Sequence, residues 1–352
     1  MLKLFRGTVG GSILSLLLKQ SSGIFPANTI SVLIRGEEKV QTLKDLGVTP
    51  ILFQSLDESE FLRKTASEHD VVIHTASGYH TSSAKSLILG LGDRVATTGA
   101  KVHYIHTSGT SNLADQPITG AYTESHIFSD TEEIYAYEKA REALQPYPQR
   151  TTDIAAIETG LSVHVPTTII MSPTIYGIGT GPFNKLSIQA PSMMRHAIAA
   201  GRVETIGNGD GVWGFVHVSD LADLYLILLK KVLAGEDVPV GEKGIMFSST
   251  GSFHWKDLAS SIADALVEVG ALDSKEVASI RLEEAAQWAN GSAYHAELGF
   301  ASNARTISDI AFGMGWKPVK TEEDFKAHSL EDARLVVKDP APRDYIRQNL
   351  IK

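Results

Sequence analysis

The sequence contains no cysteine, so neither disulfide bonds nor thiolate chemistry contributes to its fold or activity. No stretch approaches the roughly 20 consecutive apolar residues that a membrane-spanning helix needs. No run of like charges suggests a charged tail. The formal net charge of -9 disfavours nucleic acid and anionic membranes as partners.

The N-terminal segment superficially resembles a secretion signal, because Lys3 and Arg6 precede the apolar run Ile13–Leu18. Gly10 and Gly11 interrupt the apolar region, and no small-residue cleavage site follows cleanly. The absence of cysteine also fits a reducing compartment. We therefore expect a cytoplasmic protein, with secretion as the alternative.

Short apolar runs alternate with helical patterns through the first half of the chain. Strands are expected at Ile30–Ile34, Pro50–Phe53, Val71–His74, Val102–His106 and Thr167–Met171, and helices at Ser12–Lys19, Glu37–Leu46, Glu58–Glu68, Ser83–Thr98 and Thr131–Leu144. This alternation predicts an α/β fold, a doubly wound parallel sheet with helices on both faces. Pro146 and Pro148 end the last of these helices, and a second helix is expected at Thr151–Thr159.

The second half of the chain is less regular, and we expect it to add a smaller substrate lobe. The predicted nucleotide-binding domain comprises residues 1–185 and 204–250, and the predicted lobe comprises residues 186–203 and 251–352. The length suits one large domain or two joined domains of this kind.

Tyr135 and Lys139 are four residues apart on the helix expected at Thr131–Leu144, which places the phenol and the ammonium on one helix face. A free phenol has a pKa of about 10, too high for proton transfer near neutral pH. A nearby positive charge lowers that pKa. The pair is therefore a candidate acid/base device.

Further motifs follow one another in a fixed order along the chain. They are Gly7-x-x-Gly10-Gly11, Arg35, Leu56-Asp57, His74-Thr75-Ala76, Thr107-Ser108-Gly109-Thr110, Tyr135-x-x-x-Lys139, Ser172-Pro173-x-x-Tyr176-Gly177, Phe215-Val216-His217-Val218-x-Asp220 and Gly315-Trp316-Lys317-Pro318. Their order and spacing resemble the extended short-chain dehydrogenase/reductase family, also called the NAD-dependent epimerase/dehydratase family, over nearly the whole length. The resemblance implies a Rossmann-like sheet, a nicotinamide cofactor and Tyr135 as the catalytic acid/base.

The resemblance also implies which residues hold the cofactor. On this sequence they would be Gly7, Gly10, Arg35, Asp57, Thr75, Ala76 and Lys139. An arginine after the second strand can receive the 2′-phosphate of NADP, whereas an acid there would bind the ribose of NAD, so NADP(H) is expected. Two plainer readings stay open: Arg35 as a solvated strand-end residue, and Asp57 as a helix cap with Glu60.

The glycine motif departs from the family pattern G-x-x-G-x-x-G, because Leu4 stands at the position of the first glycine. In one reading, Leu2–Phe5 is a shortened first strand, and the Gly7 and Gly10 amides still meet phosphate at a helix N-terminus. In the other, cofactor binding is weakened or lost and the fold serves another chemistry.

A second departure lies after the fifth strand, where the family uses a serine or threonine to hold the substrate oxygen. Aligned by the strand end, that position falls on Gly109, and Ser108 and Thr110 flank it. We expect either hydroxyl to serve. The alternative is that both hydroxyls cap a turn.

Other residues give weaker expectations. Tyr122 and Glu124 lie in a long loop from which they could reach the substrate. The apolar side chains of Phe183, Met193, Met194 and Trp213 are expected either to line a substrate pocket or to form the core of the lobe. His74 is expected in the core, and the alternating His103 and His106 have no carboxylate at metal-ligand spacing, so no metal site is predicted.

Three functions remain open from the sequence. The first is an NADP(H)-dependent oxidoreductase acting on a small carbonyl or hydroxyl compound. The second is a lyase, isomerase or cyclase that uses Tyr135 without a cofactor, and it is motivated by Leu4 and Gly109. The third is a cofactor-sensing regulator, which the Tyr135 and Lys139 pair argues against. A homodimer is the expected assembly by resemblance.

Overall fold

The computed structural model describes residues 2–4, 7–20 and 25–341, with side chains described from Gly7 onward. Its centre is a seven-stranded sheet in the order β11-β7-β5-β4-β1-β2-β3, and every neighbouring pair is parallel. The strands are β1 (Leu2–Leu4), β2 (Ser31–Ile34), β3 (Thr49–Leu52), β4 (Val71–His74), β5 (His103–Gly109), β7 (Thr167–Ser172) and β11 (Ile245–Phe247).

The first strand is short, as one of the two readings expected. Leu2–Leu4 pairs on one side with β2 and on the other with β4, which places it at the centre of the sheet. Phe5 lies outside the described residues. Gly7 then begins α1 (Gly7–Lys19), so the connection between strand and helix is compressed to two residues.

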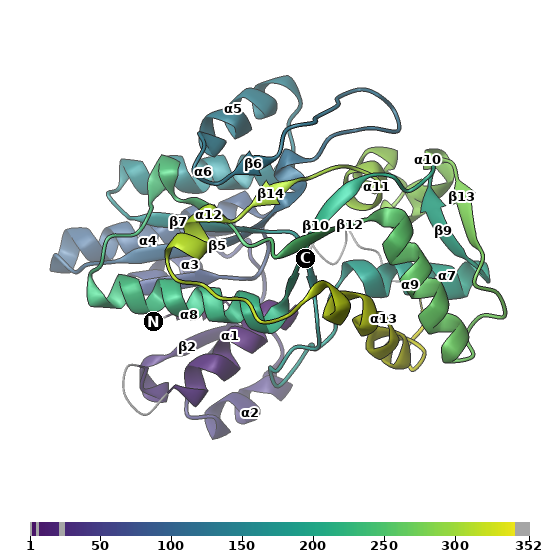
Figure 1. Cartoon of the computed structure of the whole chain (residues 1–352). Helices are drawn as coiled ribbons and strands as arrows, with labels where there is room; N and C mark the ends of the chain where they lie inside the picture. Colours follow the sequence, from purple (N-terminus) through teal and green to yellow (C-terminus); the bar gives the residue numbers. More distant parts are fainter. Residues whose placement is uncertain (1, 5–6, 21–24, 342–352) are drawn as a thin grey trace.

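Helices cover both faces of the sheet (Figure 1), which confirms the doubly wound α/β prediction. One face carries α1 and α8 (Val218–Ala234), whose leucines and Ile13 form one apolar cluster with β2 and β4. The other face carries α3 (Ser59–Ser67), α4 (Thr81–Thr98) and α6 (Pro148–Ser162), which share a second cluster. The short helix α2 (Val40–Asp45) precedes β3, and α5 (Ile134–Leu144) packs against α6.

Gly90 allows α4 to approach α3 closely. A Cβ atom at Gly90 would lie 2.1 Å from the carbonyl oxygen of Arg63 and 2.8 Å from the Cβ of Ala66. Backbone at that distance cannot rotate away as a side chain can, so any added methyl group forces the two helices apart.

We therefore predict that Gly90→Ala lowers the free energy of unfolding by about 1–3 kcal/mol, the usual cost of overpacking. This net loss is expected although alanine in an unhindered helix gains about 1 kcal/mol over glycine. Urea unfolding measures the difference. Gly313→Ala, at the end of a helix where a Cβ would meet nothing within 4 Å, is the control and should not destabilise. Equal behaviour of the two variants would contradict the packing account.

A smaller lobe is built around a separate apolar cluster that includes Met193, Met194 and Trp255. Its elements are α7 (Gln189–Ala200), β9 (Val203–Ile206), α9 (Trp255–Glu268), β13 (Val277–Ile280), α10 (Leu282–Ala285), α11 (Ala293–Phe300) and α13 (Glu322–Val336). In Figure 1 this lobe lies beside the carboxyl ends of the sheet strands. A three-stranded sheet of β8 (Thr174–Tyr176), β10 (Val212–His217) and β12 (Gly251–His254) lies between the two parts.

Short elements complete the described chain. They are β6 (Phe128–Ser129), β14 (Thr306–Ile307), α12 (Asp309–Gly313) and the 3-10 turns η1 (Ala27–Thr29), η2 (Glu37–Lys39), η3 (Thr110–Leu113), η4 (Gly241–Lys243) and η5 (Ala286–Ala289). None of the helices within residues 7–20 and 25–341 combines the length and the apolarity that crossing a bilayer requires.

Part of the segment assigned to the predicted lobe, residues 306–316, instead packs against the larger part of the molecule. β14 pairs with β6, and Trp316 is buried in the cluster of α1 and α8, where its indole N–H donates to the carbonyl of Asp220 at 2.7 Å. Residues 306–316 thus contact the larger part of the molecule. The division into two domains otherwise stays a prediction.

Candidate functional site

Tyr135 and Lys139 are neighbours on α5, as the spacing predicts, but they face α6. The Tyr135 hydroxyl donates to Glu158 at 3.1 Å, and the Lys139 ammonium pairs with the same carboxylate at 2.7 Å. Lys139 and Glu158 are about half exposed, with 51% and 50% of their side chains accessible. Neither Tyr135 nor Lys139 is among the described residues that line the two cavities considered below.

The net shift of the Tyr135 pKa is also opposite to the one expected. Burial of the phenol and the nearby Glu158 carboxylate raise the pKa of Tyr135, and the opposing effect of Lys139 is smaller. The predicted direction of the shift is therefore wrong, because no sequence pattern indicates that the Glu158 carboxylate, from another helix, contacts both Tyr135 and Lys139.

A cavity of about 150 Å³ lies at the carboxyl ends of β5 and β7, where the smaller lobe meets the sheet. Ligands of open α/β sheets bind at this edge. Its walls come from the end of β5 and the following turn, the loop before α4, the start of α6, and the elements β8, β10, α7 and α11. The described lining residues are Tyr79, Ser108, Gly109, Thr110, Ser111, Tyr147, Gln149, Ser172, Pro173, Ile175, Ile188, Gln189, Trp213, His295 and Gly299.

Tyr147 supplies the phenol of this cavity. Gln145 precedes Pro146 and has extended backbone, which ends α5. Pro148 then occupies the first turn of α6, where a missing N–H costs nothing, so Tyr147 becomes the extended residue directly before that helix. The Pro-Tyr-Pro sequence thus places the Tyr147 ring at the N-terminal end of the helix that packs beside α4 on the sheet.

Three hydroxyls and an amide form a chain around Tyr147. Its hydroxyl donates to Ser111 at 3.1 Å and lies 3.2 Å from the hydroxyl of Tyr79, and Ser111 donates to Gln149 at 2.6 Å. A guanidinium group, that of Arg150, lies 5.8 Å from the centre of the Tyr147 ring. The cavity therefore holds a tyrosine and a serine within hydrogen-bond distance of each other, and a tyrosine is one of the side chains that can transfer a proton to a substrate oxygen.

The predicted hydroxyls Ser108 and Thr110 do line this cavity, and the sequence reasoning missed Ser111 and Tyr147. Ser111 lay one residue beyond the quoted motif. The Tyr-x-x-x-Lys pattern points to Tyr135, which Lys139 follows at a spacing of four, and not to Tyr147, where Thr151 stands at that spacing. The signal that could have found Tyr147 is its position immediately before the second helix.

Three of the residues that line this cavity carry polar atoms without a hydrogen-bond partner. The hydroxyl of Thr110, the indole nitrogen of Trp213 and Nε2 of His295 are buried and have no hydrogen-bond partner. Leaving such groups unsatisfied costs about 1–3 kcal/mol each, so a bound molecule that pairs with them gains that energy. No lysine, arginine, aspartate or glutamate occurs among the described lining residues.

A second cavity, of about 240 Å³, lies over β2 and the start of α1. Its described lining residues are Gly7, Ile34, Arg35, Lys39, Phe53, Leu56, Ala76, Phe183 and Asn184. Gly7 has φ +72 and an added Cβ would meet nothing within 4 Å, so open space lies in front of the helix N-terminus. Such an N-terminus attracts phosphate through its free N–H groups and the helix dipole.

Two cationic side chains, those of Arg35 and Lys39, line this cavity and lie four residues apart. The Lys39 ammonium donates to the carbonyl of Arg35 at 2.8 Å, and it also lies 5.9 Å from the Phe183 ring. The Arg35 guanidinium lies 6.0 Å from the Phe53 ring. The donor set therefore fits a phosphorylated nucleotide whose aromatic base contacts Phe53 or Phe183. Lys39 was not predicted from the sequence.

The segment after β8 is rich in glycine because it packs so closely along α1 that side chains would not fit. A Cβ at Gly181 would lie 2.4 Å from the Cα of Gly11, and one at Gly179 would lie 2.7 Å from the Thr8 side chain. Thr8 donates to the carbonyl of Leu186 at 2.5 Å. This close approach carries Phe183 and Asn184 to the wall of the second cavity.

Of the other predicted cofactor residues, only Ala76 is among the described residues that line the second cavity. Ala76 lines the second cavity and Thr75 precedes it at the end of β4, whereas Gly10 is buried within α1. Asp57 is largely exposed and accepts from Ser55 at 2.9 Å and pairs with His80 at 3.1 Å. It does not cap α3, whose preceding residue is Glu58.

The Tyr122 hydroxyl donates a hydrogen bond to Glu124 at 2.7 Å, and the Arg141 guanidinium lies 3.4 Å from the centre of the Tyr122 ring. Neither Tyr122 nor Glu124 is among the described residues that line either cavity. Among the predicted pocket residues, Trp213 lines the first cavity, Phe183 lines the second, and the two methionines belong to the lobe core. Within the described residues, no group of three histidine or carboxylate side chains could hold a metal ion.

Comparisons with known proteins agree with this architecture. The model of the NAD dependent epimerase/dehydratase family matches residues 5–241. The chain is 26% identical over 331 residues to the oxidase ucsJ of an Acremonium species, covering 89% of this chain and 90% of that protein. It is also 26% identical over 334 residues to the uncharacterised protein YLL056C of Saccharomyces cerevisiae, covering 92% and 96%.

Solved structures share the fold at low sequence identity. The dTDP-glucose 4,6-dehydratase DesIV of Streptomyces venezuelae, with NAD and TYD bound, has a TM-score of 0.65 at 15% identity, covering 96% of this chain and 98% of that one. The UDP-glucose 4-epimerase of Thermotoga maritima, with UDP-glucose, has a TM-score of 0.60 at 16% identity, covering 96% and 100%.

Proposed function

This chain belongs to the NAD dependent epimerase/dehydratase family, and on that premise we propose that it is an NADP(H)-dependent oxidoreductase acting on a small, uncharged carbonyl or hydroxyl compound. The observation that carries the proposal is the presence of two cavities at the carboxyl ends of strands of the same parallel sheet. One presents two cations beside a helix N-terminus, and the other presents a tyrosine and a serine within hydrogen-bond distance.

Arg35 and Lys39 support NADP rather than NAD. A phosphate on the 2′-oxygen of the ribose gains from two adjacent cations, whereas the unphosphorylated ribose is usually held by an acid at the end of the second strand. The described lining of this cavity contains no acid. When bound, such a cofactor would supply or accept a hydride, and Gly7 and Ala76 would contact it.

The proton of the reaction is assigned to Tyr147 instead of Tyr135. The Tyr147 hydroxyl lines the cavity and can pass its proton to a carbonyl oxygen, and Ser111 can hold the same oxygen once its hydroxyl turns away from Gln149. Thr151 stands four residues after Tyr147, where the family has its lysine, and the Arg150 guanidinium beside the ring is paired with Glu142. The acid/base role of Tyr135 stays a prediction that the geometry does not favour.

The cavity lining supports a small neutral substrate. Its volume of about 150 Å³ lies below the range of about 300–1,000 Å³ that holds drug-sized ligands. A diphosphate would be left without a cation there, because the described lining carries none. Tyr79, Tyr147 and Trp213 instead offer aromatic surface and hydroxyl or N–H donors.

One observation favours a second candidate, a lyase or isomerase that works without a cofactor. No lysine is among the described residues that line the cavity of Tyr147, so none of them makes the usual link between the phenol and a nicotinamide ribose. In that case Tyr147 would move a proton between substrate atoms. Turnover by a nucleotide-free preparation distinguishes this candidate from the first.

The test of the proposed function is cofactor binding followed by turnover. Titration calorimetry of the full chain with NADPH should show one site, and a panel of neutral aldehydes and ketones beginning with benzaldehyde and cyclohexanone should show NADPH oxidation. Absence of NADPH binding at millimolar concentration would overturn the redox proposal. Turnover without any nicotinamide would favour the second candidate.

A further inference from the structure

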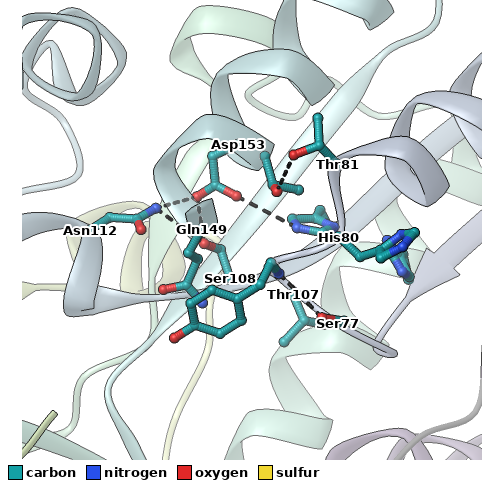
Figure 2. Close-up of polar contacts among 12 residues, drawn as sticks. Ser77, His80, Thr81, Thr107, Ser108, Asn112, Gln149 and Asp153 are labelled. Atoms are coloured by element: carbon teal, nitrogen blue, oxygen red, sulfur yellow. Dashed lines mark hydrogen bonds and ion pairs between the residues drawn. The ribbon is translucent and has the colours of Figure 1, made fainter. Parts of the chain in front are cut away.

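A cluster of buried polar side chains contacts the hydroxyl of Ser108, which lines the first cavity (Figure 2). Ser108 lies 2.5 Å from an oxygen of Asp153, and the Asn112 amide donates to that same oxygen at 2.7 Å. The amide also donates to Glu138 at 2.7 Å, so it bridges two carboxyl groups. Asp153 and Glu138 are both fully buried.

Among the described residues, no lysine or arginine forms an ion pair with either carboxyl group, although the charge of Arg150 opposes the rise in the pKa of Glu138. The Arg150 guanidinium donates to Glu142 and to the backbone carbonyls of Asn112 and Gln145. Two unpaired charges this close together in a dry interior are strongly unfavourable, so the pair retains at least one proton. Burial raises the pKa of Asp153 to about 8, and burial together with the Asp153 charge raises the pKa of Glu138 well above its ordinary value.

A line of neutral rings continues from Asp153 across the sheet. The second Asp153 oxygen lies 3.6 Å from Nε2 of His106, and neither atom has a hydrogen-bond partner. His106 lies 3.2 Å from the Tyr104 hydroxyl, which lies 2.8 Å from His74. Burial lowers the pKa of His106 to about 3 and also lowers that of His74, so neither ring offers Asp153 a positive charge.

We propose that Asp153 acts as a positioning residue that decides whether the Ser108 hydroxyl donates a hydrogen bond into the cavity. An ionised Asp153 accepts the hydroxyl proton and turns it inward. A protonated Asp153 can donate to the Ser108 oxygen instead, which frees the hydroxyl hydrogen to point at a ligand. The groups that face this cluster are Glu138 and Glu142 from α5, Arg150 from α6, and His74, Tyr104 and His106 from the sheet.

The consequence for a ligand rests on the proposed function. A carbonyl oxygen only accepts hydrogen bonds, so it should bind best when Asp153 is protonated and lose that bond as the pH rises through about 8. An alcohol can donate, so its binding should survive the ionisation of Asp153. The direction of the Ser108 hydroxyl thereby selects between the oxidised and the reduced ligand.

Infrared spectroscopy tests the switch without any substrate or cofactor. In a Glu138→Gln background, where Asp153 is the remaining carboxyl of the pair, the absorption of a protonated buried carboxyl should be present near neutral pH, fade at alkaline pH, and be absent after Asp153→Asn. Adding Ser108→Ala removes a donor to the carboxylate, so the midpoint of the titration should move to higher pH. A missing band, or a midpoint that Ser108→Ala leaves unchanged, would overturn the proposal.

Kinetics supply the second arm. With NADPH and whichever aldehyde or ketone of the panel is turned over, KM of the wild type should rise at alkaline pH, kcat should change less, and Asp153→Asn should abolish the pH dependence of KM. Glu138→Gln should retain it. Loss of the dependence in Glu138→Gln alone would assign the effect to the wrong carboxyl and refute the inference. If no carbonyl is reduced, the proposed function fails while the infrared result still decides the switch.

Discussion

Replacing Tyr147 with phenylalanine is expected to lower kcat for NADPH-dependent carbonyl reduction by roughly 100- to 10,000-fold, the usual contribution of a positioned general acid. The substitution removes one oxygen and keeps the ring that packs against Tyr79 and Tyr294. The fold and the affinity for NADPH should therefore persist. Stopped-flow or steady-state measurement of NADPH oxidation gives the rate.

Tyr135→Phe is the matched control, because it removes the same atom from a tyrosine on the neighbouring helix. Its loss is one hydrogen bond to a half-exposed carboxylate, worth about 0.5–1.5 kcal/mol of stability, and its kcat should stay close to that of the wild type. The reverse outcome, an inactive Tyr135→Phe beside an active Tyr147→Phe, would return the acid/base role to Tyr135. Circular dichroism of both variants separates lost chemistry from lost folding.

Removing both cations of the second cavity should weaken NADPH binding much more than NADH binding. A charge-assisted hydrogen bond contributes about 1.5–3 kcal/mol, so Arg35→Ala should raise the Kd for NADPH by roughly 10- to 100-fold, with a further increase on adding Lys39→Ala. The Kd for NADH should change little, because no 2′-phosphate is lost. Titration calorimetry with each nucleotide measures both constants.

Salt and a surface arginine provide the controls for this prediction. Screening should narrow the difference between NADPH and NADH at high ionic strength in the wild type and have less effect in the double variant. Arg63→Ala removes a cation that pairs with Asp93 on the surface, away from the lining of the cavity, and should leave both constants unchanged. Equal losses for NADPH and NADH in Arg35→Ala would show that Arg35 does not read the phosphate.

The elements of the sheet could be predicted because each depends on residues close in sequence. Val71–His74 was placed to the residue, and β2, β3, β5 and β7 were placed within a few residues, since buried parallel strands form short apolar runs between turn signals. The helix of Tyr135 and Lys139 was also correct, as was the break at Pro146 and Pro148. The predicted Ser108, Thr110 and Arg35 line the two cavities and lie at or just after the ends of strands, the edge at which open α/β sheets bind ligands.

The partners of those residues could not be predicted in the same way. Glu158 lies 19 residues beyond Lys139 and reaches it only because α5 and α6 pack side by side. Asp153 meets Ser108 across 45 residues of chain. Neither contact leaves a periodic pattern in the sequence, because each depends on how separate elements pack.

The amino-acid sequence by itself determined the family, the doubly wound sheet and the edge at which the two cavities lie, since local periodicity and motif order encode these. Only the tertiary structure decided which tyrosine lines the cavity, which cations accompany Arg35 and which carboxyl lies beneath Ser108. These depend on the packing angle of two adjacent helices and on the return of distant loops, and a helix face becomes inner or outer only when its neighbours are in place.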